Sequence, residues 1–273
     1  MGAAKQKKLV KSKILQNAER CVYCANKSDL TIEHMPPISI FTDRLRPAGL
    51  MFAACKDCNN GSSGADFVAN IFSRLSGRNE DEKFWASKEG KKAFAGLDKF
   101  APEVRADTLR NHTAKPKWVL DANTGLYKSM ISMELNSPIL KNYLDVFAAK
   151  IGMTLFCEHV GNPLPLKGGV QTFWFLNEGI NQKQVRAILK ILPLHGKLKQ
   201  GTFNSDGQFV YRYNCDGKSI FAALVLIRSD LIILVFAVSD LKFRECFDQL
   251  PLFERTANFM QPGHLLEKLI SAD

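Results

Sequence analysis

Two pairs of cysteines near the N-terminus are the residues of this sequence whose type and spacing best fit a chemical task. Each pair has the spacing Cys-x-x-Cys, with Cys21 and Cys24 in the first pair and Cys55 and Cys58 in the second. A tight turn at each pair lets both sulfurs face one ion, and four thiolates at this spacing are the ligand set of a tetrahedral structural zinc. The sequence therefore predicts a Zn²⁺ site, and the loop between the pairs contains the dipeptide Glu33-His34.

The residues around these cysteines resemble a known family. The two cysteine pairs, the acid–histidine dipeptide Glu33-His34 and an asparagine, Asn59, directly after the last cysteine are together similar to the zinc-containing branch of the HNH endonucleases. That family has the ββα-metal or His-Me finger fold, and the resemblance covers residues 19–75. The sequence departs from the family pattern because no asparagine lies between His34 and Cys55. The histidine therefore has no assigned orienting partner.

The resemblance implies a metal-dependent endonuclease that hydrolyses phosphodiester bonds in DNA. It gives His34 the role of general base, and it gives Glu33 and Asn59 the role of holding a catalytic Mg²⁺ or Mn²⁺ ion. A neutral imidazole that takes a proton from water contributes about 10²–10⁴ in rate. One hard cation with open water positions stabilises the charge that develops on the phosphate. Neighbours on a strand point to opposite faces, so we expect a bulge or turn at Glu33-His34, with a cation at the strand edge as the alternative.

A second hypothesis uses the same zinc site without any hydrolysis. The protein would then be a zinc-stabilised nucleic-acid-binding or adaptor protein, in which Glu33 forms a surface salt bridge and His34 packs against neighbours. Asn59 alone also fits a turn former after a cysteine pair. Asp57 and Asp66 are expected to be solvated or to cap a helix rather than to bind a metal.

The charge of the chain favours an anionic partner. Lys and Arg number 37 against 27 Asp and Glu, which gives a formal net charge of +10. Such an excess is typical of proteins that bind nucleic acid, although RNA, an acidic membrane or a merely solvated basic surface also fits it. We expect DNA as the partner. The candidate phosphate contacts border the zinc region or precede it: Lys5, Lys7, Lys8, Lys11, Lys13, Arg44, Arg46 and Lys56.

Cysteine usage and hydropathy predict a soluble protein of the cytoplasm. The three cysteines outside the pairs, Cys157, Cys215 and Cys246, are an odd number without a pattern, which favours a reducing compartment. The basic N-terminus is not followed by a long apolar run, so it does not resemble a secretory signal. Residues 220–238 are the most apolar segment, but Arg228 and Asp230 interrupt them. Two strands joined by a turn explain this segment better than a membrane span, and no membrane partner is expected.

The pattern of apolar residues, prolines and glycines predicts an α+β protein in several parts. Residues 1–18 form a basic N-terminal arm, which is either a helix laid against phosphates or, as we favour, a solvated segment. Residues 19–76 form the zinc module, in the order strand, strand, zinc turn, helix. Residues 77–116 form a helical connector that is interrupted at Pro102. Residues 117–273 form a larger α+β domain with an antiparallel sheet, which selects the target, a further protein or ligand partner, or the activation state.

Local signals place the elements of this larger domain. Ser137-Pro138 is a helix start, with serine as the cap and proline in the first turn, and Cys157-Glu158-His159 is the end of that helix, where the helix dipole favours a histidine. Asp216-Gly217 is typical of a two-residue hairpin turn. The remaining expectations are a hairpin of 118–121 with 126–135, strands at 171–176, 208–214, 218–227 and 231–238, a helix opening at Asn181, and short helices after Ser239 and Pro262.

Overall fold

The structure is a computed structural model. It describes residues 3–75, 79–120, 124–135, 137–176, 182–200, 203–205, 207–228, 230–245 and 258–270. These residues form a mixed α+β protein with antiparallel sheets and a cluster of four cysteines near the N-terminus. The expectations for Asn181 and Cys246 lie outside the described residues.

The N-terminal region contains a two-stranded hairpin followed by helices, in the predicted order. Helix α1 (Ala3–Asn17) is followed by strands β1 (Leu30–His34) and β2 (Met51–Cys55), and then by helices α2 (Lys56–Gly61) and α3 (Ser63–Phe72). The described part of the N-terminal arm is therefore a helix that contacts both strands. Contact of this helix with phosphates stays a prediction. Strand β1 ends where Pro36 and Pro37 follow, since proline cannot donate to a ladder. Short 3-10 turns η1 (Ile38–Ile40) and η2 (Thr42–Arg44) lie in the loop between the strands.

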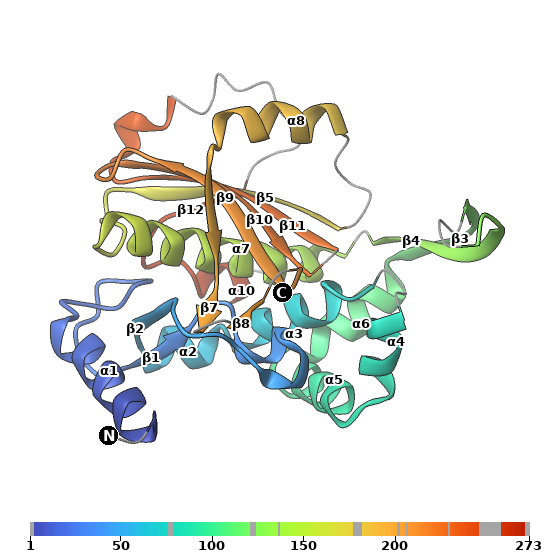
Figure 1. The fold of residues 1–273 in the computed structure, drawn as a ribbon, viewed down its shortest axis with the longest axis horizontal. Helices are drawn as coiled ribbons and strands as arrows, with labels where there is room; N and C mark the ends of the chain where they lie inside the picture. The colour runs from blue at the N-terminus through green and yellow to red at the C-terminus, as the bar shows by residue number, and fades with distance from the viewer. Residues whose placement is uncertain are drawn as a thin grey trace.

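The connector consists of helices α4 (Asn79–Ala86), α5 (Lys88–Phe100) and α6 (Pro102–Arg110). The side chain of Ser87 caps α5 by accepting a hydrogen bond from the backbone N–H of Gly90. Pro102 occupies the first turn of α6, so the predicted interruption of the connector at this residue is confirmed. The hairpin of β3 (His112–Leu120) and β4 (Tyr127–Leu135) then projects away from the body of the molecule (Figure 1).

The C-terminal region is an antiparallel sheet with a helix on each face. Its strand order is β12-β5-β11-β10-β9-β6. The long helix α7 (Pro138–Val160) covers one face of this sheet and α8 (Gln182–Ile191) lies over the other (Figure 1). The β1–β2 hairpin with its cysteines lies on the side of α7 away from the sheet (Figure 1). Ser137 caps α7 as predicted, and Gly161 ends it in the left-handed conformation with φ 88°. The strands of the sheet are β5 (Gly169–Leu176), β6 (Leu194–Lys197), β9 (Phe209–Cys215), β10 (Ile220–Ile227), β11 (Leu231–Val238) and β12 (Asn258–Met260).

The remaining elements are short. They are β7 (Lys199–Gln200), β8 (Phe203–Asn204), η4 (Leu241–Phe243) and α10 (Glu267–Ile270). The sequence did not predict β6, β7, β8 or β12, which carry few residues and little periodicity. The apolar segment 220–238 is the predicted pair of strands, β10 and β11, whose turn includes Arg228 at φ 51°.

Helix α7 joins the two regions through one continuous core. Buried residues of the β1–β2 hairpin, of α3, of α7 and of one sheet face belong to a single apolar cluster. Close packing of α7 on the sheet depends on Gly152, where a Cβ atom would lie 2.4 Å from Cγ2 of Val170. Within the described part of the chain, no helix has the length and apolar character needed to cross a membrane.

Candidate functional site

The four paired cysteines converge as the sequence predicts. Their sulfur atoms all lie within 4.8 Å of one another, and Cys21, Cys55 and Cys58 are buried. Cys55 ends β2 and accepts a hydrogen bond from the backbone N–H of Cys58 in α2, so the strand–helix junction positions the second pair. Hydrogen bonding from Cys58 lowers the pKa of the Cys21 thiol to about 5. The four sulfurs fit a tetrahedral zinc ion, which needs thiolate ligands.

The Glu33 carboxylate lies in a buried ionic cluster rather than at the surface. Its Oε1 atom accepts a hydrogen bond from the Tyr23 hydroxyl at 3.1 Å and lies 3.2 Å from Nζ of Lys150. Lys150 comes from α7, is fully buried, and also donates to Oδ1 of Asp66 at 2.7 Å. Two carboxylates therefore share one ammonium group at the junction of β1, α3 and α7.

The pKa values in this cluster follow from burial and from the neighbouring charges. Burial, together with the nearby Glu33 carboxylate, raises the pKa of Asp66 to about 6, although the Lys150 ammonium opposes both. Burial lowers the pKa of Lys150, but the Asp66 and Glu33 carboxylates outweigh it, so the net direction is upward. Lys150 is therefore a permanent cation of the folded protein. The expectation that Asp66 is solvated or a helix cap is wrong, because its carboxylate is bound inside the molecule.

His34 lies on the opposite face of β1 from Glu33. The pairing of β1 with β2 is regular through both residues, with Glu33 opposite Phe52 and His34 opposite Met51. The expected bulge or turn is therefore wrong, because the strand keeps its alternation to its last residue. The imidazole is half-buried, and burial, followed by the positive charges of Arg46 and Lys11, lowers the pKa of His34. A neutral imidazole at physiological pH follows from this environment.

Asn59 lies beside β1, and among the described hydrogen bonds it makes none with Glu33, the other predicted metal ligand. Its side-chain amide donates to the Thr31 hydroxyl at 3.0 Å. Because Thr31 and Glu33 are two residues apart on a strand, Asn59 lies over the same face as Glu33. Tyr23 and Lys150 both bind Oε1 of Glu33, so a divalent cation at this oxygen would compete with the Lys150 ammonium group. The assignment of Glu33 and Asn59 to a catalytic metal stays a prediction.

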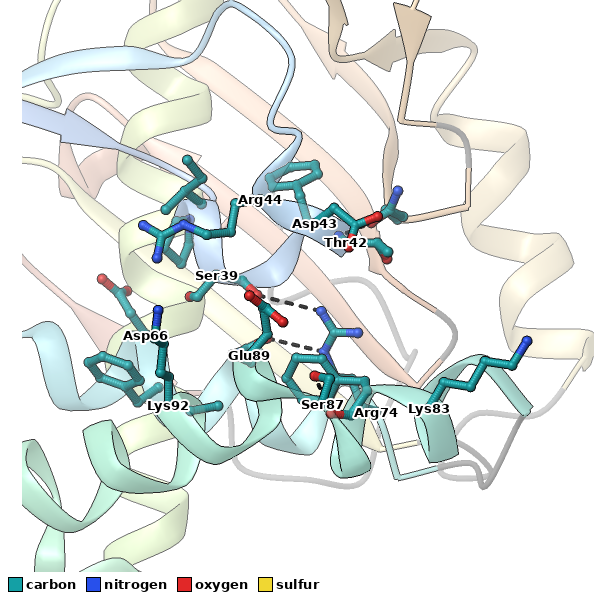
Figure 2. Close-up of a pocket in the computed structure, with 18 residues that line it drawn as sticks. Ser39, Thr42, Asp43, Arg44, Asp66, Arg74, Lys83, Ser87, Glu89 and Lys92 are labelled. Atoms are coloured by element: carbon teal, nitrogen blue, oxygen red, sulfur yellow. Dashed lines mark hydrogen bonds between the residues drawn. The ribbon is translucent and has the colours of Figure 1, made fainter.

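A cavity of about 890 Å³ opens beside this ionic cluster (Figure 2). Its walls come from the loop at residues 37–44, from α3, from α4 and α5, and from Gln208. Asp66 is part of the wall, so the cavity reaches the carboxylate that Lys150 binds. Of the residues predicted to contact phosphates, Arg44 lines this cavity.

The other predicted phosphate contacts have varied surroundings. Arg46 is held by backbone carbonyl groups, including Pro36 at 2.9 Å and Gly49 at 2.8 Å, so its guanidinium group fixes the loop between the strands. Lys56 is exposed and lies 3.9 Å from Asp29. The lysines of α1 whose side chains are described are exposed; they are Lys5, Lys8, Lys11 and Lys13.

Sequence reasoning missed three members of the ionic cluster: Tyr23, Asp66 and Lys150. Tyr23 lies inside the first Cys-x-x-Cys pair, and Asp66 lies in the first turn of α3, where a capping role was the simplest interpretation. The detectable signal was Lys150, a single lysine within the otherwise apolar run from Val146 to Met153. A lysine at such a position is buried only when it is paired.

No protein-family model matches the chain, and neither curated proteins nor solved structures give a significant match.

Proposed function

We propose that this protein is a zinc-stabilised, HNH-type endonuclease that hydrolyses phosphodiester bonds in DNA, with His34 as the general base. The observation that carries the proposal is the position and the lowered pKa of the His34 imidazole. It is a half-buried imidazole at the end of a strand, and burial and two nearby cations lower its pKa. A general base must be unprotonated and reachable by water, and both conditions favour this residue.

The surroundings of His34 support the handling of a phosphodiester. Lys11 and Arg46 lie close enough for their charges to act on the imidazole, and the same charges would attract a phosphate to this side of β1. The His34 imidazole would take a proton from the attacking water. The four cysteines would hold the hairpin that carries the imidazole, because zinc ties the end of β2 to the turn before β1.

The contacts of Glu33 oppose the divalent cation that the resemblance implies. In HNH enzymes, Mg²⁺ or Mn²⁺ stabilises the charge on the reacting phosphate, and Glu33 and Asn59 are the matching residues here. Because Lys150 and Tyr23 bind the Glu33 carboxylate, a cation at this position would compete with the ammonium group. We therefore assign no catalytic step to a metal at Glu33.

The same contact favours the second candidate, a zinc-stabilised protein that binds nucleic acid without cutting it. A carboxylate neutralised by a buried lysine is a stable structural unit, and it needs no catalytic role. In that case His34 would pack against its neighbours, and the basic residues of the chain would account for binding.

Nicking of supercoiled plasmid separates the two candidates. Purified zinc-loaded protein is incubated with plasmid in Mg²⁺, in Mn²⁺ and in EDTA, beside His34→Ala and the matched control His195→Ala. His195 is exposed on β6 and lies outside the zinc region. The nuclease proposal requires that wild type and His195→Ala nick and that His34→Ala does not. Wild type that retards plasmid on a gel but never nicks it would support the binding protein.

A further inference from the structure

The cavity beside Asp66 has positive groups at its opening. Arg44, Lys83 and Lys92 line it, all three are exposed, and none has an ion pair with another described residue. Arg44 comes from η2 and Lys92 from α5, and their side chains approach each other beside Asp66, while Lys83 extends outward from α4 (Figure 2). Two cations from separate elements therefore face the same cavity. The carboxylates of Asp43, Asp66 and Glu89 line it as well (Figure 2), but none of them forms an ion pair with Arg44 or Lys92 among the described residues.

The inner wall of the cavity is fixed by Arg74. This buried side chain donates to the carbonyl oxygen of Ile40 at 2.7 Å and to Oδ1 of Asn70 at 3.2 Å. Its guanidinium carbon lies 3.9 Å from the centroid of the Phe84 ring. Arg74 thereby ties the loop after β1 to α3 and α4, so the cavity is formed before any ligand arrives. Preformed cavities with a few convergent polar groups are typical of binding sites.

The rim that carries Arg44 is also held in place. Asp43 and Arg44 both have left-handed backbone conformations, with φ 52° and φ 59°. The backbone N–H of Thr42 donates to Oε1 of Gln208 at 2.8 Å, and Arg228 donates to the same oxygen at 3.0 Å. Surrounding contacts therefore maintain an uncommon conformation that presents the Arg44 side chain to the cavity. Conformations of this kind cluster where a ligand is clamped.

We propose that this cavity binds a phosphate of single-stranded nucleic acid, with Arg44 and Lys92 contacting the phosphate oxygens. A guanidinium and an ammonium group are the usual donors to phosphate. The neighbouring Phe67 and Phe84 give the cavity an apolar wall, which suits the base or sugar that follows a phosphate. A cavity of about 890 Å³ has the size of a small-ligand site, so it accepts one strand or its end but not a duplex.

The inference rests on the proposed function and adds to it a contact for an unpaired segment or strand end, separate from the phosphodiester on which His34 would act. A phosphate between Arg44 and Lys92 lies next to Asp66, which Lys150 links to Glu33. The strand would therefore be held on the α3 side of the hairpin. His34 lies on the other side of β1, so binding at the cavity and the state of the imidazole can be measured separately.

The test is the affinity of the full-length, zinc-loaded protein for a short, fluorescently labelled single strand, measured by anisotropy without added Mg²⁺ or Mn²⁺ at several salt concentrations. The variants are Arg44→Ala, Lys92→Ala and the double variant. Lys91→Ala is the matched control, because Lys91 is an exposed lysine on the same helix that does not line the cavity. Thermal melting of each variant verifies that it is folded.

We expect the double variant to bind roughly tenfold more weakly than wild type at moderate salt. Each lost phosphate contact should reduce the slope of log affinity against log salt by about 0.7, which is the value for single strands. Lys91→Ala should keep the wild-type slope. Equal weakening by Lys91→Ala and Lys92→Ala, or wild-type binding by the folded double variant, overturns the inference.

Plasmid nicking distinguishes this failure from a failure of the proposed function. If the double variant binds the strand as tightly as wild type, but wild type nicks plasmid, the cavity inference fails and the nuclease proposal stands. If binding depends on Arg44 and Lys92, but wild type never nicks plasmid, the cavity inference stands and the nuclease proposal fails.

Discussion

The Nζ atom of Lys150 lies 3.2 Å from Oε1 of Glu33, and both groups are buried. Lys150 belongs to α7, which covers one face of the C-terminal sheet, whereas Glu33 belongs to the hairpin of β1 and β2. This ion pair therefore joins the two regions at the position where the family resemblance predicts a divalent metal. Asp66 shares the same ammonium group at 2.7 Å, so the lysine neutralises carboxylates from both β1 and α3.

We predict that Lys150→Met strongly destabilises the protein. The substitution leaves the Glu33 and Asp66 carboxylates buried without a cation, and breaking a buried pair in this way costs about 3–5 kcal/mol. The measurement is the free energy of unfolding from denaturant titration at neutral pH.

Lys141→Met is the matched control on the same helix. Lys141 pairs with Asp145 at 2.8 Å, but the Lys141 side chain is 53% exposed. Although Asp145 is buried, it keeps its contacts with Trp174 and Lys268 when Lys141 is replaced, so the expected cost is about 0–1 kcal/mol. Equal stability of Lys150→Met and Lys141→Met would show that the buried ion pair does not hold the regions together.

Zinc content is the second prediction. We expect one zinc ion for each chain, measured by metal analysis of the purified protein, and we expect Cys55→Ser to lose it, because a tetrahedral site needs all four thiolates. A strong chelator should release the ion and unfold the hairpin, which circular dichroism detects. Cys215→Ser is the control, since Cys215 lies on β9 outside the cluster. A zinc content unchanged in Cys55→Ser would contradict the assignment of the four ligands.

The pH dependence of nicking is the third prediction. A general base works in its unprotonated form, so the rate should be lost as pH falls through the pKa of His34. Burial and the charges of Arg46 and Lys11 lower that pKa from 6.5, so the midpoint of the acidic limb should lie below pH 6.5.

Lys11→Gln removes one of the two charges and should move the acidic limb of the profile towards higher pH. Lys8→Gln, an exposed lysine on the same helix, should leave the limb in place. Profiles that coincide for Lys11→Gln and Lys8→Gln, or a wild-type midpoint above pH 6.5, would argue against this environment for the base.

Much of the fold could be predicted from local signals in the sequence. The two cysteine pairs predict their own convergence, Pro36 marks the end of β1, and Ser137 marks the start of α7. Each of these signals acts within a few residues: the spacing of the cysteine ligands, the missing backbone N–H of proline, and the hydrogen bond of a helix cap. The α+β class and the strands on either side of Gly217 follow from signals of the same kind.

The ionic cluster could not be predicted in this way. Lys150 and Asp66 are 84 residues apart in the sequence, and nothing local to either residue indicates the other. The regular pairing of β1 with β2 through Glu33 and His34 was not predicted. The resemblance favoured one site shared by both side chains, whereas neighbours on a regular strand point to opposite faces. The position of Arg46 was missed because bonding to backbone carbonyls depends on the path of the loop.

The most direct test of the central proposal is chemical rescue of His34→Ala. Nicking of supercoiled plasmid is followed for zinc-loaded wild type and for His34→Ala, without and with added imidazole. Loss of a general base should slow nicking by about 10²–10⁴, and free imidazole should restore part of the rate while leaving wild type unaffected. If His34→Ala nicks as fast as wild type, or if wild type itself never nicks, His34 is not the base of a nuclease.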